Sequence, residues 1–126
     1  MLSLLALSLF ACSEPEPELH QSTVKTDLDY YKLEMIWLPN PHTVDQMVSL
    51  EVAPFIAGET LGWFQIEMTP YMPEHSHGLT DPVELFEKTQ STIGNWTYPM
   101  EGNWEITIDI DGPKGPDSAV LTIEVL

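Results

Sequence analysis

The strongest constraint on the fold is the strict alternation of apolar and polar residues over positions 103–110. Successive side chains of a β-strand point to opposite faces, so this pattern predicts a strand with one buried and one solvated face. A tight Asp-Gly-Pro connection at 111–113 leads into a second alternating segment at 119–125, and the pair predicts a hairpin. The residues expected on the buried face are Trp104, Ile106, Ile108 and Ile110.

Shorter alternating segments recur upstream, each bounded by proline, glycine or asparagine, and no segment shows a sustained helical period. The pattern therefore predicts an all-β, immunoglobulin-like β-sandwich of about seven strands, in one domain of 126 residues. The upstream segments are 31–37, 47–52, 61–68, 83–87, 89–93 and 95–98. We expect five large side chains from these patterns to pack in the core: Met35, Met47, Met68, Trp63 and Trp104.

The first residues predict a secretion signal rather than a part of the fold. Residues 1–11 are an apolar run too short to span a bilayer but of the length of a signal-peptide core. The run Leu9-Phe-Ala-Cys12 resembles the lipobox of bacterial lipoproteins, which implies a lipid on Cys12, with Ser13 permitting outer-membrane sorting. No lysine or arginine precedes the run, which leaves open a start codon further upstream, and an incidental cysteine after an apolar end is the alternative.

Residues 12–26 are expected to form an acidic Pro/Glu tether between the anchor and a domain over 27–126. Alternating proline and glutamate can neither form a helix nor be buried, and His20 within this segment is expected to be solvated. Cys12 is the only cysteine, so the domain contains no disulfide and no cysteine-based zinc site.

The charge balance excludes one class of partner. The chain has twenty acidic residues but only four lysines and no arginine, which gives a formal net charge of -16. Binding to a nucleic-acid backbone needs clustered lysine and arginine, so we expect no nucleic-acid partner. The same charge repels anionic lipid headgroups, so the membrane is contacted only through the lipid anchor.

A short stretch rich in histidine and methionine is the candidate site. In an extended chain His75 and His77 point to the same side, and Met72 lies three residues earlier, beyond a bend at Pro73. Imidazole nitrogen and thioether sulfur are a soft ligand set that selects copper, above all Cu(I). Solvated histidines and a gap-filling methionine are the alternative. Spacing alone leaves Met100 undecided between a ligand and a packing residue.

The remaining histidine, His42, is not expected to be a ligand. It follows a proline at a strand junction, a position typical of a turn residue.

The candidate region, residues 68–110, resembles the YtkA-like domain, which is related to FixH-like and CopC-like periplasmic β-sandwiches. The resemblance is carried by Met72-Pro-x-His75-x-His77-Gly78, by Gly94, and by Tyr98-Pro-Met100-x-Gly102-x-Trp104. It implies a small extracytoplasmic sandwich associated with copper handling, in some members near respiratory oxidase assembly. The implied ligands are Met72, His75, His77 and Met100.

The leading hypothesis is a non-enzymatic, lipid-anchored periplasmic protein that holds Cu(I), and tolerates Cu(II), as a buffer or chaperone. Its partners would be the copper ion and a recipient, either another envelope copper protein or an oxidase subunit. The alternative is a metal-free scaffolding or adhesive domain. Catalysis is disfavoured because the sequence offers no nucleophile–base arrangement and a shell of two histidines and two methionines leaves no open position for a substrate.

Overall fold

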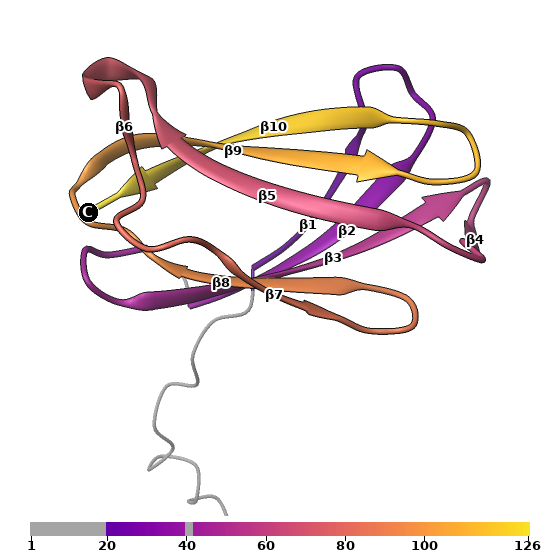
Figure 1. The fold of residues 1–126 in the computed structure, drawn as a ribbon, viewed down its shortest axis with the longest axis horizontal. Helices are drawn as coiled ribbons and strands as arrows, with labels where there is room; N and C mark the ends of the chain where they lie inside the picture. Colours follow the sequence, from indigo (N-terminus) through magenta and orange to yellow (C-terminus); the bar gives the residue numbers. More distant parts are fainter. Residues whose placement is uncertain (1–19, 40–41) are drawn as a thin grey trace, which may run out of the picture.

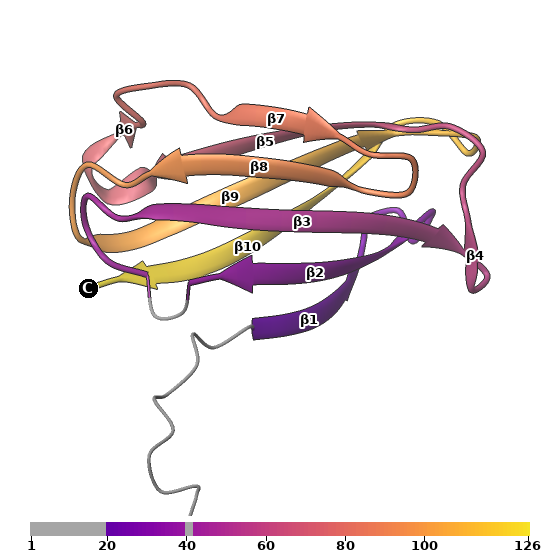
Figure 2. The same ribbon diagram turned by 90° about the horizontal axis from the view of Figure 1, so that it is seen from below.

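The computed structural model describes residues 20–39 and 42–126, in which two antiparallel sheets stack face to face (Figures 1 and 2). This arrangement confirms the predicted all-β sandwich. Cys12 and the apolar segment before it lie outside the described residues. Within the described ranges, no helix is long and apolar enough to cross a membrane.

The first sheet has the strand order β1-β2-β3-β8-β7, with the short β4 paired to β3. Its strands are β1 (His20–Lys25), β2 (Lys32–Leu38), β3 (Met47–Ile56), β4 (Glu59–Thr60), β7 (Glu84–Glu87) and β8 (Thr92–Thr97). The second sheet has the order β10-β9-β5-β6. Its strands are β5 (Gln65–Met72), β6 (His77–Gly78), β9 (Gly102–Asp111) and β10 (Asp117–Val125). A single turn of 3₁₀-helix, η2 (Pro73–His75), follows β5.

The core lies between the sheets and is built from alternate residues of the central strands. Along β9 every second side chain is buried, as the sequence pattern predicts, and Trp104 is fully enclosed. Met35 and Met68 are buried as expected. Met68 lies so close to β8 that a Cβ added to Gly94 would clash with its sulfur. Glycine at this position therefore permits the two sheets to approach each other.

Two of the predicted core residues are exposed. Met47 is 56% exposed, because it opens β3 on the outward side of the alternation. Trp63 is 55% exposed, because β5 begins only at Gln65 and the tryptophan lies in the connection before it. The predicted strand at 61–68 is therefore displaced to 65–72. As a result, β5 ends at Met72.

The domain begins earlier than the sequence indicated. Strand β1 pairs antiparallel with β2 through all six of its residues, with Val24 opposite Leu33. Its residues fall inside the range predicted for the tether, so the backbone of His20 belongs to the sheet rather than to a linker. Strand β3 likewise continues past Pro54, where the chain was expected to stop. Because β8 flanks β3 only as far as Val52, the proline lies beyond the segment paired with β8.

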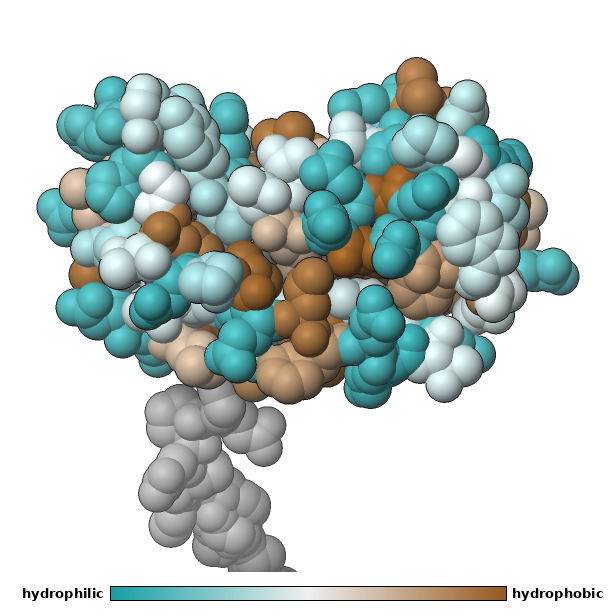
Figure 3. Space-filling view, viewed as in Figure 1, coloured by the Kyte–Doolittle hydropathy of each residue, from teal (hydrophilic) through white to brown (hydrophobic). Residues whose placement is uncertain are grey.

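The two sheets leave one long side of the sandwich open. Strand β7 ends the first sheet. Among the described residues, β5 has no hydrogen-bonded neighbour on its outer edge except where β6 pairs with its last two residues. Figure 3 shows apolar residues gathered across the middle of the face drawn in Figure 1, surrounded by hydrophilic ones. Leu85 and Phe86 of β7 are 40% and 50% exposed.

Candidate metal centre

The turn between β5 and β6 carries three of the four predicted ligands. Met72 ends β5 and is the cross-strand partner of His77 in β6. Pro73 starts the 3₁₀ turn and His75 ends it, and Ser76 then adopts left-handed backbone angles of φ 48° and ψ 46°. The expected extended path through both histidines is therefore wrong. A hairpin, rather than strand alternation, brings Met72 and His77 side by side.

The three side chains differ in burial. Met72 is 1% exposed and belongs to the core, whereas His75 is exposed and His77 is half-buried. The burial of Met72 is what the alternative of a gap-filling methionine predicts. A Cβ added to Gly102, at the start of β9, would lie 2.7 Å from the Met72 methyl carbon and 3.8 Å from its sulfur. Gly102 has φ +128°, and its lack of a side chain leaves room for the thioether.

The orientation of the His77 ring is set by its own neighbour. The Nδ1 atom of His77 hydrogen-bonds the backbone carbonyl of Gly78. A carbonyl oxygen can only accept, so Nδ1 carries the proton and Nε2 holds the lone pair in the neutral ring. This is the arrangement seen in metal-binding histidines, whose second nitrogen donates to a carbonyl or carboxylate. The ring also lies 6.4 Å from the Trp104 ring, edge to face.

Met100 lies in the loop between β8 and β9 and packs against the core. Its carbonyl accepts a hydrogen bond of 3.1 Å from Nε1 of Trp104. Trp104 therefore contacts His77 through its ring and holds the Met100 loop through its N–H. Sequence reasoning treated Trp104 as a core residue, which it is, but missed this second contact. The Met-x-Gly-x-Trp spacing was the available signal.

The donor set matches a soft metal ion better than a hard one. In the ranges 20–39 and 42–126, no group of three or more histidine, cysteine, aspartate or glutamate side chains is placed to hold a metal ion. Of the predicted ligands at this turn, two are histidines, so the further donor expected there is methionine sulfur. Thioether sulfur with imidazole nitrogen suits Cu(I) and binds calcium or magnesium poorly. The residues at the β5–β6 turn thus fit copper by their chemistry.

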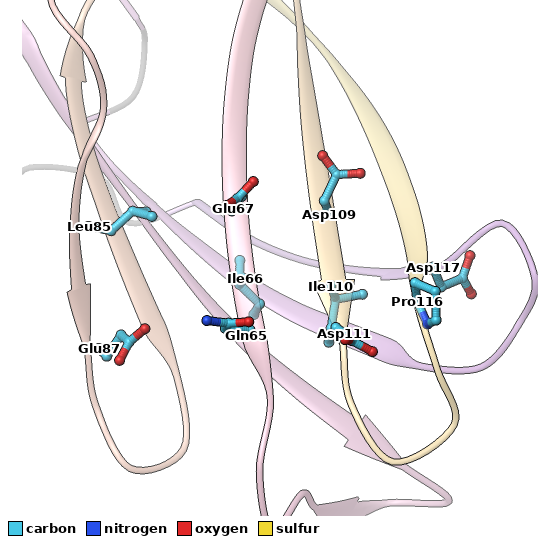
Figure 4. A pocket seen from close by; sticks show the side chains of 10 residues that line it. All are labelled: Gln65, Ile66, Glu67, Leu85, Glu87, Asp109, Ile110, Asp111, Pro116 and Asp117. Atoms are coloured by element: carbon cyan, nitrogen blue, oxygen red, sulfur yellow. The ribbon is translucent and has the colours of Figure 1, made fainter.

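An acidic cavity lies at the opposite end of β5 and β9 (Figure 4). Its carboxylates include Glu67, Glu87, Asp109 and Asp111, and in Figure 4 they point in different directions rather than at one shared point. A fifth carboxylate lines the same cavity and belongs to Asp117.

The carboxylate of Asp117 is already used by the fold. It accepts hydrogen bonds from the backbone N–H groups of Leu28 at 3.0 and 3.1 Å, Tyr30 at 3.3 Å and Ser118 at 2.8 Å. Burial raises the pKa of Asp117, but these bonds and the Thr26 side chain outweigh burial and lower it overall. One of the carboxylates lining this cavity thus holds the β1–β2 turn, and within the described ranges no three of them are grouped so as to hold a metal ion.

His42, predicted to be a turn residue, forms an isolated β-bridge and is buried. It is 4% exposed, it forms a parallel bridge with Val125, and its ring lies 4.7 Å from that of Trp37. Its Nδ1 is 3.1 Å from the hydroxyl oxygen of Tyr98. Burial raises the pKa of Tyr98, and the neighbouring Trp96 side chain offsets only part of this effect. The residues around His42 contain no pattern that indicates its pairing with Tyr98.

The comparisons with known proteins support the fold. No protein-family model matches the chain, and no curated protein sequence matches it. Among solved structures, the chain is similar to a copper-bound variant of FetP from uropathogenic Escherichia coli, with 12% identity and a TM-score of 0.52. That match covers 88% of this chain and 93% of FetP. FetP as isolated after periplasmic expression gives 13% identity, a TM-score of 0.50, and coverage of 86% and 95%. At this identity the similarity is one of fold.

Proposed function

We propose that this protein binds one copper ion, preferentially Cu(I), outside the cytoplasm and that it does so as a buffer or chaperone rather than as an enzyme. The observation that carries the proposal is the cross-strand pair of Met72 and His77. The hairpin brings a sulfur donor and an imidazole with an unprotonated Nε2 to the same end of one sheet.

The four proposed ligands are Met72, His75, His77 and Met100, and each has a distinct environment. Met72 supplies a buried thioether that water reaches poorly, and His77 supplies the pre-oriented nitrogen. His75 ends an exposed helical turn, so it can meet the ion first and release it last. Met100 would complete the shell from the loop that Trp104 holds. A bound copper ion would supply redox-active soft-metal chemistry, and mixed nitrogen and sulfur donors accommodate both of its oxidation states.

The comparisons add weight to this proposal. A copper-bound form of FetP shares the fold, which places copper binding within the range of this architecture. The sequence resemblance to YtkA-like domains points the same way and suggests that the recipient is another envelope copper protein or an oxidase subunit. We further propose that Cys12 is lipidated and tethers the domain to the periplasmic side of a membrane, with the outer membrane favoured by Ser13.

A metal-free scaffolding or adhesive domain is the second candidate. Such a role would be favoured by stacked aromatic side chains on the surface. Three of the four tryptophans, however, are at most 3% exposed, and only Trp63 is prominent on the surface. The buried ones are Trp37, Trp96 and Trp104. The aromatic residues therefore support the core more than a ligand-binding face.

Anaerobic titration of Cu(I) against a competing chelator tests the proposal. The parent protein should bind one equivalent, and the double substitution His75→Ala with His77→Ala should abolish stoichiometric binding. His20→Ala is the matched control, because it removes a histidine from β1, which belongs to the other sheet, and should leave binding intact. Unchanged binding in the double variant would refute the proposed site.

A further inference from the structure

A continuous series of aromatic rings leads from the proposed copper site into the core. Trp104 contacts His77, and the Tyr98 ring lies 5.3 Å from the Trp104 ring. The His42 ring follows at 5.6 Å from Tyr98. Trp104, Tyr98 and His42 are all buried. Such close ring contacts allow single electrons to move between neighbouring side chains, since each ring has a delocalised π-system that can lose an electron.

The rings differ in what can accept their proton, and this decides where an oxidising equivalent stops. Nε1 of Trp104 is bonded to a carbonyl, which does not take up a proton near neutral pH. Trp96 branches from Tyr98 at 6.1 Å, and its buried Nε1 has no hydrogen-bond partner in the described part of the chain. Only the Tyr98 hydroxyl, among these three groups, is bonded to a base, the Nδ1 atom of His42 at 3.1 Å.

We propose that Trp104, Tyr98 and His42 form a redox relay that draws an oxidising equivalent away from the copper ligands and holds it on Tyr98 as a neutral tyrosyl radical. The relay requires the His42 tautomer with its proton on Nε2, so that the Tyr98 hydroxyl donates to Nδ1. The inference rests on the proposed function for the source of the oxidant, which would be a hydroxyl radical formed from hydrogen peroxide by one-electron reduction at a bound Cu(I) ion. The other products of that reaction are hydroxide and Cu(II).

The steps balance in electrons and protons. The hydroxyl radical takes one electron from Trp104 and becomes hydroxide, which leaves a tryptophan radical cation. That cation takes one electron from Tyr98 and returns to neutral tryptophan. As the electron leaves, the O–H bond of Tyr98 breaks and its proton passes to Nδ1 of His42. The products are a neutral tyrosyl radical and a protonated imidazole, so the positive charge ends on His42.

The relay would protect the ligands that make copper binding possible. Oxidation turns a methionine thioether into a polar sulfoxide and removes its soft sulfur donor. Met72 and Met100 are the two proposed sulfur ligands, so an oxidant formed at a bound ion would arise beside them. An oxidising equivalent that reaches Tyr98 instead lies among buried aromatic residues, where a hydrogen-bonded phenol can hold it without loss of a ligand.

The relay can be tested in metal-free protein with an attached photo-oxidant. The parent for this experiment carries Cys12→Ser and Glu74→Cys, which gives one attachment point for a ruthenium polypyridyl complex beside the histidines. It also carries Tyr71→Phe, because Tyr71 is 40% exposed and close in sequence to the label. A flash in the presence of an electron acceptor generates ruthenium(III). Electron paramagnetic resonance should then show a tyrosyl radical, whose spectrum narrows when ring-deuterated tyrosine is incorporated.

Three substitutions and one control locate the radical and its proton acceptor. Tyr98→Phe should remove the signal, whereas Tyr30→Phe, a control at a half-buried tyrosine in contact with Tyr31, should keep it. Trp104→Phe should lower the rate of radical formation at least about tenfold, which corresponds to about 1.4 kcal/mol of barrier. His42→Gln should suppress the radical, because an amide oxygen can accept the hydrogen bond but cannot take the proton. Survival of the signal in Tyr98→Phe or an undiminished signal in His42→Gln would overturn the relay.

A measurement on the labelled parent covers the case in which a core variant fails to fold. Radical formation should be slower in deuterium oxide, because the proton moves with the electron, and equal rates in the two solvents would contradict the proposal. Since the photo-oxidant replaces copper and peroxide, this experiment is independent of copper binding. Unchanged copper binding in the histidine double variant, together with an intact radical in this experiment, would refute the site and retain the relay.

Discussion

Met72 and His77 face each other as the last cross-strand pair of β5 and β6, and the chain reverses between them within four residues. The sulfur of Met72 is fixed by the core, and the ring of His77 is fixed by the carbonyl of Gly78. One hairpin thus positions two side chains of different chemistry, both of which are proposed copper ligands. Such pre-organisation reduces the cost of ordering ligands upon binding.

Gly102→Ala is expected to disturb both the fold and copper binding. Its new Cβ would lie 2.7 Å from the Met72 methyl carbon, at a residue with φ +128°. We expect a loss of about 1–3 kcal/mol in unfolding free energy, measured by urea denaturation, and a weaker Cu(I) affinity. Gly115→Ala is the matched control, because Gly115 also has positive φ, +101°, but its Cβ would meet nothing within 4 Å. Equal Cu(I) affinities in the two variants would contradict the role of Gly102 beside Met72.

The carboxylate of Asp117 is expected to make the fold sensitive to acid. Its hydrogen bonds lower its pKa in the folded state, so its stabilising effect is fully present above the unfolded-state pKa of about 3.9. The effect is lost as the pH falls through the lower folded-state pKa. Asp117→Ala should reduce the unfolding free energy at neutral pH by about 2 kcal/mol and flatten its acid dependence. Asp81→Asn, at an exposed position, is the control and should change neither the unfolding free energy nor its acid dependence. If Asp117→Ala loses stability with falling pH just as the parent does, Asp117 is not the cause of the acid sensitivity.

Two carboxylates oppose each other on the outer face of the second sheet. Glu67 of β5 is the direct partner of Asp109 of β9, and both are exposed (Figure 4). Like charges at directly opposed positions destabilise a sheet, so Glu67→Gln should raise the unfolding free energy by about 0.5 kcal/mol at low ionic strength. The gain should shrink in 1 M salt, where screening extends over only about 3 Å. Glu124→Gln is the control, because Glu124 is paired with Asn103; the same gain there would contradict a pairwise effect.

Two methionines of the first sheet allow a buried position to be compared with an exposed one. Met35 is 2% exposed and Met47 is 56% exposed, although both lie in strands of the first sheet. Met35→Ala should lower the unfolding free energy by about 2–5 kcal/mol through cavity formation, whereas Met47→Ala should change it by less than about 0.5 kcal/mol. Thermal and urea denaturation of the two variants provide the comparison. Similar losses for both would show that Met47 packs against something in solution.

The parts of the fold that the sequence predicted are those in which burial alternates cleanly. In β9 the apolar positions lie opposite polar ones without exception from Trp104 to Ile110, so both the strand and its buried face could be predicted. Strand β1 could not, because it is an edge strand with mostly polar residues and it gains its place by pairing with β2. The shift of β5 has a similar cause, since Trp63 is apolar but lies outside the sheet.

The candidate site could be predicted in composition but not in geometry. Residue chemistry identified Met72, His75 and His77 as a soft donor set. The local backbone followed Pro73 instead, which starts a 3₁₀ turn because its fixed φ suits the first helical position. The pairing of His42 with Tyr98 joins residues 56 positions apart. Contacts of that kind arise from the topology of the two sheets, and nothing in the local sequence indicates them.

The most direct test of the account is X-ray absorption spectroscopy of the protein loaded with one equivalent of Cu(I). The proposal that Met72 and the two histidines share one ion predicts a mixed first shell, with imidazole nitrogen and thioether sulfur around the same copper. Met72→Leu, which keeps the apolar volume of the side chain, should reduce the sulfur contribution and leave the nitrogen contribution in place. A shell of nitrogen and oxygen alone, identical in the parent and in Met72→Leu, would contradict the account.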